Sequence, residues 1–187
     1  MKPEYRRRPV FVTGFMATGK SKVGRLLARQ LDRIFLDTDE LVEARAGMPV
    51  SEIFTRRGED AFRALESQSV AQAASTADAV VSLGGGAITR EENLAAIEAA
   101  DGLLVCMEAD VDTILERVSR KDDRPLLAGL NMQEKREKIV RLLAERQPYY
   151  ARAHLNVRTG EDIEPEAVAA ETAVRVRRLL AGLPEEE

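Results

Sequence analysis

Apolar and polar positions divide the chain into two kinds of segment. Short, continuous apolar runs rich in β-branched residues are typical of strands buried on both faces, and longer amphipathic segments are typical of helices. The apolar runs predict strands at residues 10–13, 34–37, 79–83, 103–107 and 155–158. The amphipathic segments predict helices at residues 20–30, 58–74, 93–100, 111–119, 133–152 and 165–180. Because helical crossovers of this length join parallel strands, we expect a three-layer α/β fold, an open sheet of about five parallel strands with helices on both faces.

Two segments depart from simple alternation. Residues 39–75 contain two or three helices between strands, which is more than one crossover needs. Residues 120–131 are polar and contain Pro125 and Gly129, so they are interpreted as a mobile loop. We therefore expect a single domain over residues 1–187, with a helical substrate-binding insertion at about 39–75 and a lid at about 119–131.

Composition and charge restrict the class of protein. The 187 residues are 44% hydrophobic and 32% charged, which suits one globular domain. We expect no membrane partner, since no apolar stretch approaches the roughly 18 residues of a membrane span, and Gly14 and Lys20 interrupt the run expected of a signal peptide. The arginines at positions 6–8 resemble either a nucleic-acid arm or a solvated tail. The net charge of −4, with no basic stripe, favours the tail and no nucleic acid.

The chain has one cysteine, Cys106, and one histidine, His154. That count argues against an intramolecular disulfide and against a zinc site. A Ser-His-Asp hydrolase is disfavoured because no Gly-x-Ser-x-Gly sequence is present. We interpret Cys106 as a small core residue and His154 as a surface or boundary residue, and we expect a reducing, cytoplasmic setting.

The strongest motif is G-x-x-x-x-G-K-[ST], which residues 14–21 match at every fixed position. We call these residues the phosphate loop. Its glycines let successive backbone N–H groups point at phosphate oxygens, and the following helix adds the positive end of its dipole. Lys20 would then reach the β- and γ-phosphates, and the Ser21 hydroxyl would ligate Mg²⁺. The alternative is a glycine-rich turn that binds nothing.

Asp37 and Asp39 follow the second predicted strand. In an extended segment their side chains would face the same way, into the carboxyl edge of the sheet where α/β proteins bind ligands. One carboxylate could hold a Mg²⁺-bound water, and the other could take the proton of an acceptor hydroxyl. The alternative is that Asp39 caps a helix over residues 40–46 and Asp37 is a turn residue.

With these motifs together, the chain resembles the shikimate kinase family. The phosphate loop is followed by similar sequences in the family's order, at residues 23–28, 36–39, 51–54, 58–66, 83–86, 124–127 and 145–150. Many families share a phosphate loop, but this ordered set spans residues 10 to 150 and is far more specific. The chain has no acid after residues 80–83, where many phosphate-loop proteins have one for Mg²⁺, and the resembled family lacks it too.

The resemblance implies ATP and Mg²⁺ sites. Arg117 would border adenine, and Arg124 would be carried by the lid onto the phosphates. Ser21 and Asp37 would contact Mg²⁺, Asp37 through water. The full set implied for ATP is Gly14, Ala17, Thr18, Gly19, Lys20, Ser21, Lys22, Arg117 and Arg124.

The resemblance also implies an acceptor site and catalytic residues. Arg63 and Arg146 would bind the carboxylate of shikimate, and a planar guanidinium suits a carboxylate because it donates two parallel hydrogen bonds. Gly84, Gly85 and Gly86 would let the backbone approach the ring, and Asp39 would bind its hydroxyls and orient or deprotonate the attacking one. Lys20, Asp39 and Arg124 are the implied catalytic residues.

Each of these positions also has a structural alternative. Arg63 and Glu66 could form a surface ion pair on one helix, and residues 84–86 could be a tight turn at a strand end. Arg146 could be solvated on its charge-rich helix, and Arg117 and Arg124 could be ordinary surface charges. Residues 120 and 121 are also basic and compete with Arg117 for its role.

The expected activity is that of a monomeric shikimate kinase. It would transfer the γ-phosphoryl group of ATP to the 3-hydroxyl of shikimate, in the pathway to chorismate and aromatic amino acids. Two rivals remain from the sequence. One is another small-molecule kinase acting on gluconate or a nucleoside monophosphate, and the other is a phosphate-loop switch that binds nucleotide without a small acceptor.

Overall fold

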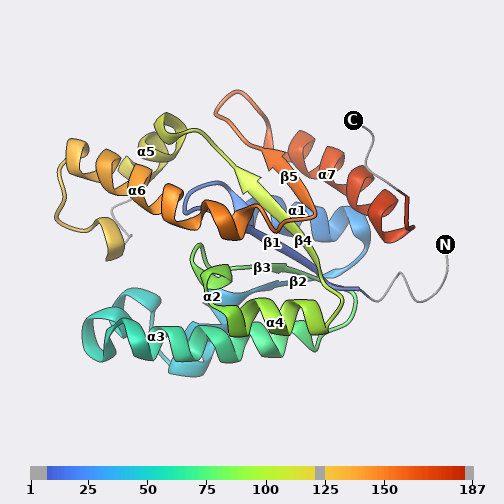
Figure 1. The fold of residues 1–187 in the computed structure, drawn as a ribbon, viewed down its shortest axis with the longest axis horizontal. Coiled ribbons are helices and arrows are strands. Elements are labelled where there is room, and N and C mark those ends of the chain that lie inside the picture. Colours follow the sequence, from blue (N-terminus) through green and yellow to red (C-terminus); the bar gives the residue numbers. More distant parts are fainter. Residues whose placement is uncertain (1–7, 121–124, 184–187) are drawn as a thin grey trace.

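Five strands form one parallel sheet in the order β2-β3-β1-β4-β5 (Figure 1). A computed structural model describes residues 8–120 and 125–183. The strands are β1 (Val10–Gly14), β2 (Ile34–Asp37), β3 (Ala79–Ser82), β4 (Leu103–Glu108) and β5 (Leu155–Arg158). The expected α/β sheet is confirmed, and the strand bounds differ from the predicted ones by one residue at most.

Helices cover both faces of this sheet. Their bounds are α1 (Lys20–Leu31), α2 (Thr38–Ala46), α3 (Val50–Ala74), α4 (Glu91–Ala99), α5 (Val111–Ser119), α6 (Met132–Tyr150) and α7 (Pro165–Leu180), with 3₁₀ turns η2 (Ala87–Thr89) and η3 (Pro125–Leu127). The expected helices between β2 and β3 are therefore α2 and α3. Helix α3 is kinked at Gly58, whose φ of 81° is accessible to glycine at little cost.

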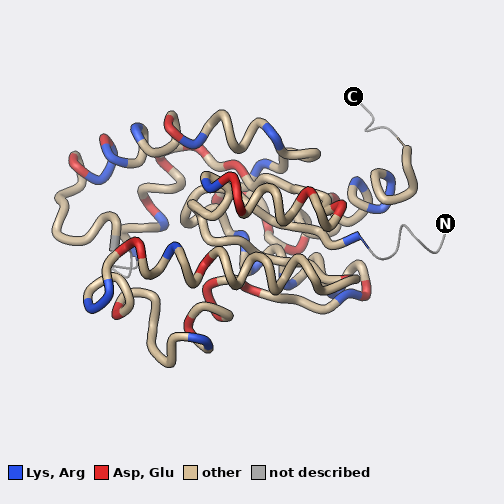
Figure 2. The backbone as a smooth tube through the Cα atoms, turned by 60° about the horizontal axis from the view of Figure 1, so that its bottom comes forward, with Lys and Arg blue, Asp and Glu red and all other residues tan. Residues whose placement is uncertain are grey.

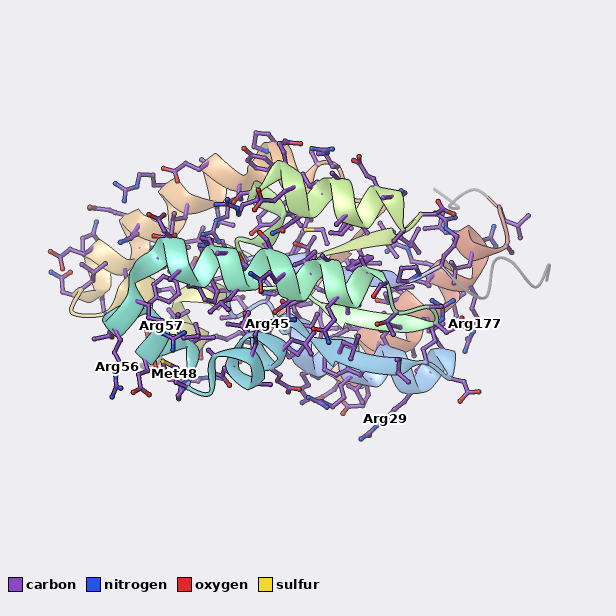
Figure 3. The ribbon with its side chains drawn as sticks, turned by 90° about the horizontal axis from the view of Figure 1, so that it is seen from below. Arg29, Arg45, Met48, Arg56, Arg57 and Arg177 are labelled. Atoms are coloured by element: carbon purple, nitrogen blue, oxygen red, sulfur yellow. The ribbon has the colours of Figure 1, made fainter. Side chains whose placement is uncertain are left out.

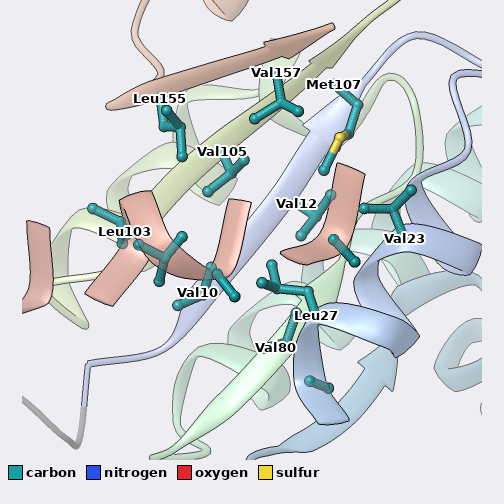
Figure 4. Packing of buried hydrophobic residues seen from close by; sticks show 14 of the residues in the cluster. Val10, Val12, Val23, Leu27, Val80, Leu103, Val105, Met107, Leu155 and Val157 are labelled. Carbon is teal, nitrogen blue, oxygen red and sulfur yellow. The ribbon is translucent and has the colours of Figure 1, made fainter. Parts of the chain in front are cut away.

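The central strand β1 separates two hydrophobic clusters. Val10 and Val12 face α1 and α7, where they meet buried side chains of β4 and β5 (Figure 4). Phe11 faces the opposite side, where α3 and α4 pack. Because both faces of β1 are buried, its residues 10–12 are continuously apolar, and each buried Val or Phe contributes roughly 1.5–3 kcal/mol. Cys106 lies in the second cluster, as expected, and His154 is exposed, with Nδ1 accepting the backbone N–H of Leu104 at 3.0 Å.

The carboxyl ends of the parallel strands meet at one edge of the sheet. The phosphate loop leaves β1 at this edge, between the ends of β3 and β4, and α2 begins there directly after β2. Ligands of open parallel sheets bind beyond this edge. The strand order therefore brings together segments that are far apart in the sequence.

Charged residues of both signs are interspersed along the helices (Figure 2). Arg56 and Arg57, on the first part of α3, project away from the body of the protein (Figure 3). Two of the three N-terminal arginines lie outside the described residues, and the third, Arg8, donates a hydrogen bond to the carbonyl of Asp101. Across residues 8–120 and 125–183, every helix is too short or too polar to span a bilayer.

The expected lid is described in part. Residues 121–124, and with them Arg124, lie outside the described residues. The segment that follows differs from the polar loop predicted from the sequence, because Leu126, Leu127 and Leu130 pack into a hydrophobic cluster with α5, α6 and the phosphate loop. Pro125 and Gly129 dominated the sequence pattern and obscured these leucines.

Candidate active site

The phosphate loop connects β1 to α1 in a curled conformation. Three of its residues have positive φ, namely Gly14 (135°), Ala17 (62°) and Gly19 (90°). A side chain at Gly14 would collide with the backbone carbonyl of Met107, which explains glycine at the first position. The Lys20 ammonium group donates a hydrogen bond to the Phe15 carbonyl at 2.8 Å, within the loop.

A cavity of about 390 Å³ opens against this loop. Lys20, Ser21 and Lys22 line it from the start of α1, and Arg117 and Arg120 line it from α5 and the residue that follows. Of the predicted ATP-binding set, Ala17 and Gly19 also border the cavity, whereas Gly14 and Thr18 shape the loop behind it. The cavity therefore offers several cationic side chains and a helix N-terminus to a polyphosphate.

The side chains of Ser21, Asp37 and Ser82 meet at the first turn of α1. The Ser21 hydroxyl donates a hydrogen bond to Asp37 Oδ2 at 2.7 Å and lies 3.3 Å from the hydroxyl oxygen of Ser82. Asp37 and Ser82 are paired in register on β2 and β3. The sequence motifs singled out Ser21 and Asp37 but not Ser82, whose position near the end of the strand predicted at residues 79–83, just before Gly84, Gly85 and Gly86 (the glycine triplet), was the available signal.

The prediction that Asp37 and Asp39 share an extended segment is wrong. The strand ends at Asp37, which caps α2 by accepting the backbone N–H of Asp39 at 3.0 Å, and Asp39 lies in the first helical turn. The alternative that Asp39 is the cap is also wrong, because the cap is Asp37. The turn separates the two carboxylates, so Asp37 faces Ser21 while Asp39 lines two cavities.

The second cavity, of about 100 Å³, adjoins the first. Both are lined by Met16, Asp39 and Gly85, so these residues form the junction between them. The rest of the second cavity consists of apolar, charged and glycine residues from four segments, namely Phe54, Phe62, Arg63, Glu66, Gly84, Gly86, Leu126 and Arg146.

Arg63 and Glu66 form a buried ion pair at the wall of this second cavity. Nη1 of Arg63 donates to Glu66 Oε2 at 2.8 Å, and the side chains are 14% and 1% exposed. The alternative of a surface ion pair is therefore wrong. Burial raises the pKa of the Glu66 carboxyl above its ordinary value, although the Arg63 guanidinium opposes the shift. Nη2 and Nε of Arg63 also donate to Glu59 on the exposed side of α3.

Helix α6 contacts the glycine triplet on the side opposite α3. Arg146 and Tyr150, four residues apart and so on one helical face, both donate hydrogen bonds to the Gly85 carbonyl, at 3.0 and 2.9 Å. Arg146 is only 7% exposed, so the alternative of a solvated arginine is wrong. Burial raises the pKa of Tyr150 to about 12, which keeps its hydroxyl a hydrogen-bond donor. No feature of the sequence marked Tyr150 as a site residue.

The glycine triplet packs closely against every other part of the site. A Cβ at Gly84 would lie 2.5 Å from Glu66 Oε1, and a Cβ at Gly85 would lie 3.2 Å from the Met16 nitrogen of the phosphate loop. The backbone N–H of Gly84 also donates to the buried Thr38 hydroxyl of α2 at 3.0 Å. The triplet is therefore more than a strand-end turn, because it connects the two cavities.

Arg117 makes four hydrogen bonds and is not an ordinary surface charge. Its donors reach the Ala17 carbonyl of the phosphate loop at 3.1 Å and the Gly160 carbonyl and Glu161 carboxylate beyond β5, both at 2.8 Å. A longer contact of 3.5 Å joins it to the Thr159 hydroxyl. Arg120, which from the sequence was an alternative to Arg117 beside adenine, also lines the first cavity.

Known proteins that are similar to this chain in sequence are shikimate kinases. The family model for shikimate kinase matches residues 16–177. A shikimate kinase from Chlorobium luteolum is 41% identical over 181 residues, which cover 94% of this chain and 89% of that protein. A shikimate kinase from Moorella thermoacetica is also 41% identical, over 93% of this chain and 97% of its own length.

Solved structures with a similar fold include shikimate kinases and a gluconokinase. A shikimate kinase from Acinetobacter baumannii, in complex with shikimate, is 31% identical with a TM-score of 0.83 over 97% of each chain. A gluconokinase from Sinorhizobium meliloti is only 16% identical, with a TM-score of 0.60 over 95% of each chain, and so shares the fold alone. On the match of the family model and the identity of these relatives, the chain belongs to the shikimate kinase family.

Proposed function

We propose that this protein transfers the γ-phosphoryl group of ATP to the 3-hydroxyl of shikimate, giving shikimate 3-phosphate and ADP. The observation that carries the proposal is the pair of adjoining cavities. One is walled by the phosphate loop, the other by two largely buried arginines, and Met16, Asp39 and Gly85 border both. Phosphoryl transfer needs a donor and an acceptor side by side, with water excluded from the junction.

The second cavity suits a small cyclic alcohol with one carboxylate. Gly86 lies between the two guanidinium groups, since a Cβ there would be 3.2 Å from both Arg63 terminal nitrogens and 3.5 Å from Nη2 of Arg146. Two guanidinium groups that converge in this way bind a planar carboxylate. The rings of Phe54 and Phe62, 4.6 Å apart between centroids, offer an apolar wall to the ligand ring.

The charges of the second cavity disfavour a nucleotide acceptor. Within the described residues its lining has two arginines, Arg63 and Arg146, and two carboxylates, Asp39 and Glu66. The formal charges cancel, which suits an acceptor with a single negative charge. A nucleoside monophosphate carries nearly two charges on its phosphate and would need a surplus of arginines.

ATP would place its phosphates on the phosphate loop. In the proposal, Lys20 leaves the Phe15 carbonyl for the β- and γ-phosphates, and Arg124 comes from the lid to the transferring group. Mg²⁺ fits the oxygens of Ser21, Asp37 and Ser82, because it prefers a few hard oxygen ligands and completes its shell with water and phosphate. When bound with ATP, the metal neutralises phosphate charge.

Asp39 is the proposed orienter or base for the attacking hydroxyl. It stands at the junction of the cavities, where an acceptor hydroxyl must meet the γ-phosphoryl group. A carboxylate there can accept the hydroxyl proton as the oxygen attacks in line. Under the same proposal the enzyme works as a monomer in the cytoplasm.

Coupled ADP release with a panel of acceptors tests the proposal. Shikimate, quinate, gluconate and AMP would each be assayed at millimolar concentration with Mg·ATP, against a background with ATP alone. We expect shikimate to give ADP well above that background and the other three to give much less. If shikimate gives no ADP above the background, the proposed function is wrong, and activity with AMP or gluconate would identify the rival.

A further inference from the structure

The loop between β5 and α7 is attached to the phosphate loop. The buried Thr159 hydroxyl lies 3.1 Å from the Thr18 carbonyl of the phosphate loop and 3.2 Å from the Glu108 carbonyl at the end of β4. The Thr159 backbone N–H donates to the same Glu108 carbonyl at 2.7 Å. Residues 159–164, which we call the β5–α7 loop (Figure 1), are thus held against the segment that would bind ATP.

Arg117 joins this loop to the phosphate loop from a third element, α5. Its Nη1 donates to the Ala17 carbonyl, its Nη2 to the Gly160 carbonyl, and its Nε to Glu161 Oε1. These partners lie around the edge of the guanidinium group and so fix its plane. The two flat faces stay outside this set of hydrogen bonds, and a guanidinium face is suited to stack on an aromatic ring system.

The carbonyl that Arg117 binds belongs to a strained residue. Ala17 has a φ of 62°, in the left-handed region that is sterically unfavourable for a non-glycine residue. The hydrogen bond from Arg117 stabilises the peptide in this conformation. The orientation of Arg117 therefore bears on the shape of the phosphate loop as well as on any base stacked upon it.

Glu161 is the anionic partner in this set. Its Oε1 accepts from Arg117 at 2.8 Å and its Oε2 lies 3.2 Å from Nη1 of Arg120, so one carboxylate joins both arginines that line the first cavity. The hydrogen bond from Arg117 lowers the pKa of Glu161 below its ordinary value. None of these three residues lines the second cavity.

We propose that Glu161 is a positioning residue for the nucleotide, which fixes the plane of Arg117 and the direction of Arg120 at the first cavity. The inference rests on the proposed function, since it takes ATP to be the phosphoryl donor. It assigns affinity for the nucleotide to a residue of the β5–α7 loop outside the phosphate loop. Affinity for the acceptor is independent of Glu161, because the second cavity shares none of its partners.

The test compares Glu161→Gln and Glu161→Ala with the control Glu164→Gln. Glu164 is an exposed residue of the same type in the same loop, and its side chain makes no capping hydrogen bond to α7. Calorimetric titrations with Mg·ADP and, separately, with shikimate give the two affinities. Initial rates give KM for ATP and kcat, and thermal unfolding gives Tm.

We expect the dissociation constant for Mg·ADP and the KM for ATP to rise about threefold for Glu161→Gln and about tenfold for Glu161→Ala. The amide of Gln can still accept one hydrogen bond, and loss of partly exposed pairs costs at most about tenfold in affinity. Shikimate affinity should stay unchanged in every variant, and the Tm of Glu161→Ala should stay within about 2 °C, because Glu161 is at the surface. Glu164→Gln should match the wild type throughout.

Two results would overturn the inference. One is a Glu161→Ala variant that binds Mg·ADP as tightly as the wild type. The other is a parallel loss of ADP affinity, shikimate affinity and Tm, which would mean that Glu161 only supports the fold. A wild type that binds no Mg·ADP at all would instead refute the proposed function, and this inference with it.

Discussion

Substitution of Gly84 by alanine adds one methyl group at the wall of the second cavity. Gly84 does not have a left-handed backbone conformation, so the backbone can accommodate alanine, and only the atoms around the new Cβ oppose the substitution. The new Cβ would lie 2.5 Å from Glu66 Oε1 and 3.1 Å from Asp39 Oδ1. Ordinary van der Waals contact begins at 3.4 Å, so the Glu66 carboxylate must move by roughly 0.9 Å.

The Glu66 carboxylate has little freedom to make this movement. It is 1% exposed, and its other oxygen accepts the 2.8 Å hydrogen bond of Arg63. Overpacking of a buried site costs about 1–3 kcal/mol, and displacement of Glu66 also displaces the guanidinium proposed to bind the acceptor. We therefore expect Tm to fall by about 2–4 °C for each kcal/mol and shikimate affinity to fall by about 10-fold to 100-fold.

The assay combines thermal unfolding with calorimetric titrations of shikimate and Mg·ADP. Gly102→Ala is the matched control, because its Cβ would lie 2.5 Å from the Phe11 ring, at the opposite end of β4 from the site. It should lower Tm comparably and leave shikimate affinity unchanged. If Gly84→Ala binds shikimate as tightly as the wild type does, Glu66 and Arg63 do not shape the acceptor site.

Three further predictions concern the same cavity. Asp39→Asn should retain both ligands within a modest factor and lower kcat by about 10²–10⁴, as measured by steady-state kinetics, and full activity would exclude Asp39 as base or orienter. Arg63→Lys should raise the KM for shikimate at least about tenfold and leave that for ATP unchanged. The control is Arg56→Lys, because Arg56 is on the same helix and its side chain is 67% exposed; this variant should change neither KM. If the wild type, Arg63→Lys and Arg56→Lys have the same KM for shikimate, Arg63 does not bind the carboxylate. Glu66 has a raised pKa in the folded state, so its contribution to stability is present below the unfolded pKa and is lost as pH rises through the folded pKa. The glutamine side chain of Glu66→Gln does not titrate. The free energy of unfolding of this variant, measured by urea unfolding relative to the wild type, should therefore increase as pH rises above about 4.5. A difference that stays constant with pH would refute the raised pKa of Glu66.

Helix α6 illustrates what sequence patterns conceal. Its sequence is rich in charge, and Arg146 is preceded by Glu145, so local sequence suggested solvent exposure as readily as a site. In the fold, Arg146 and Tyr150 reach the Gly85 carbonyl, 61 and 65 residues away in the sequence. Family resemblance identified Arg146, whereas Tyr150 had no local signal that distinguished it from a core tyrosine.

The pattern of residues was enough to place the strands, to infer their parallel arrangement and to find the phosphate loop. Each of these depends on short-range physics, namely the periodicity of apolar residues and the backbone conformations that glycine permits over eight residues. The fold, in contrast, brings Asp37 to Ser21 and Ser82, turns Asp39 toward the junction of the cavities and places Arg117 where it joins three segments. The burial and direction of a polar side chain depend on which distant segments pack around it, and a local pattern does not carry that information.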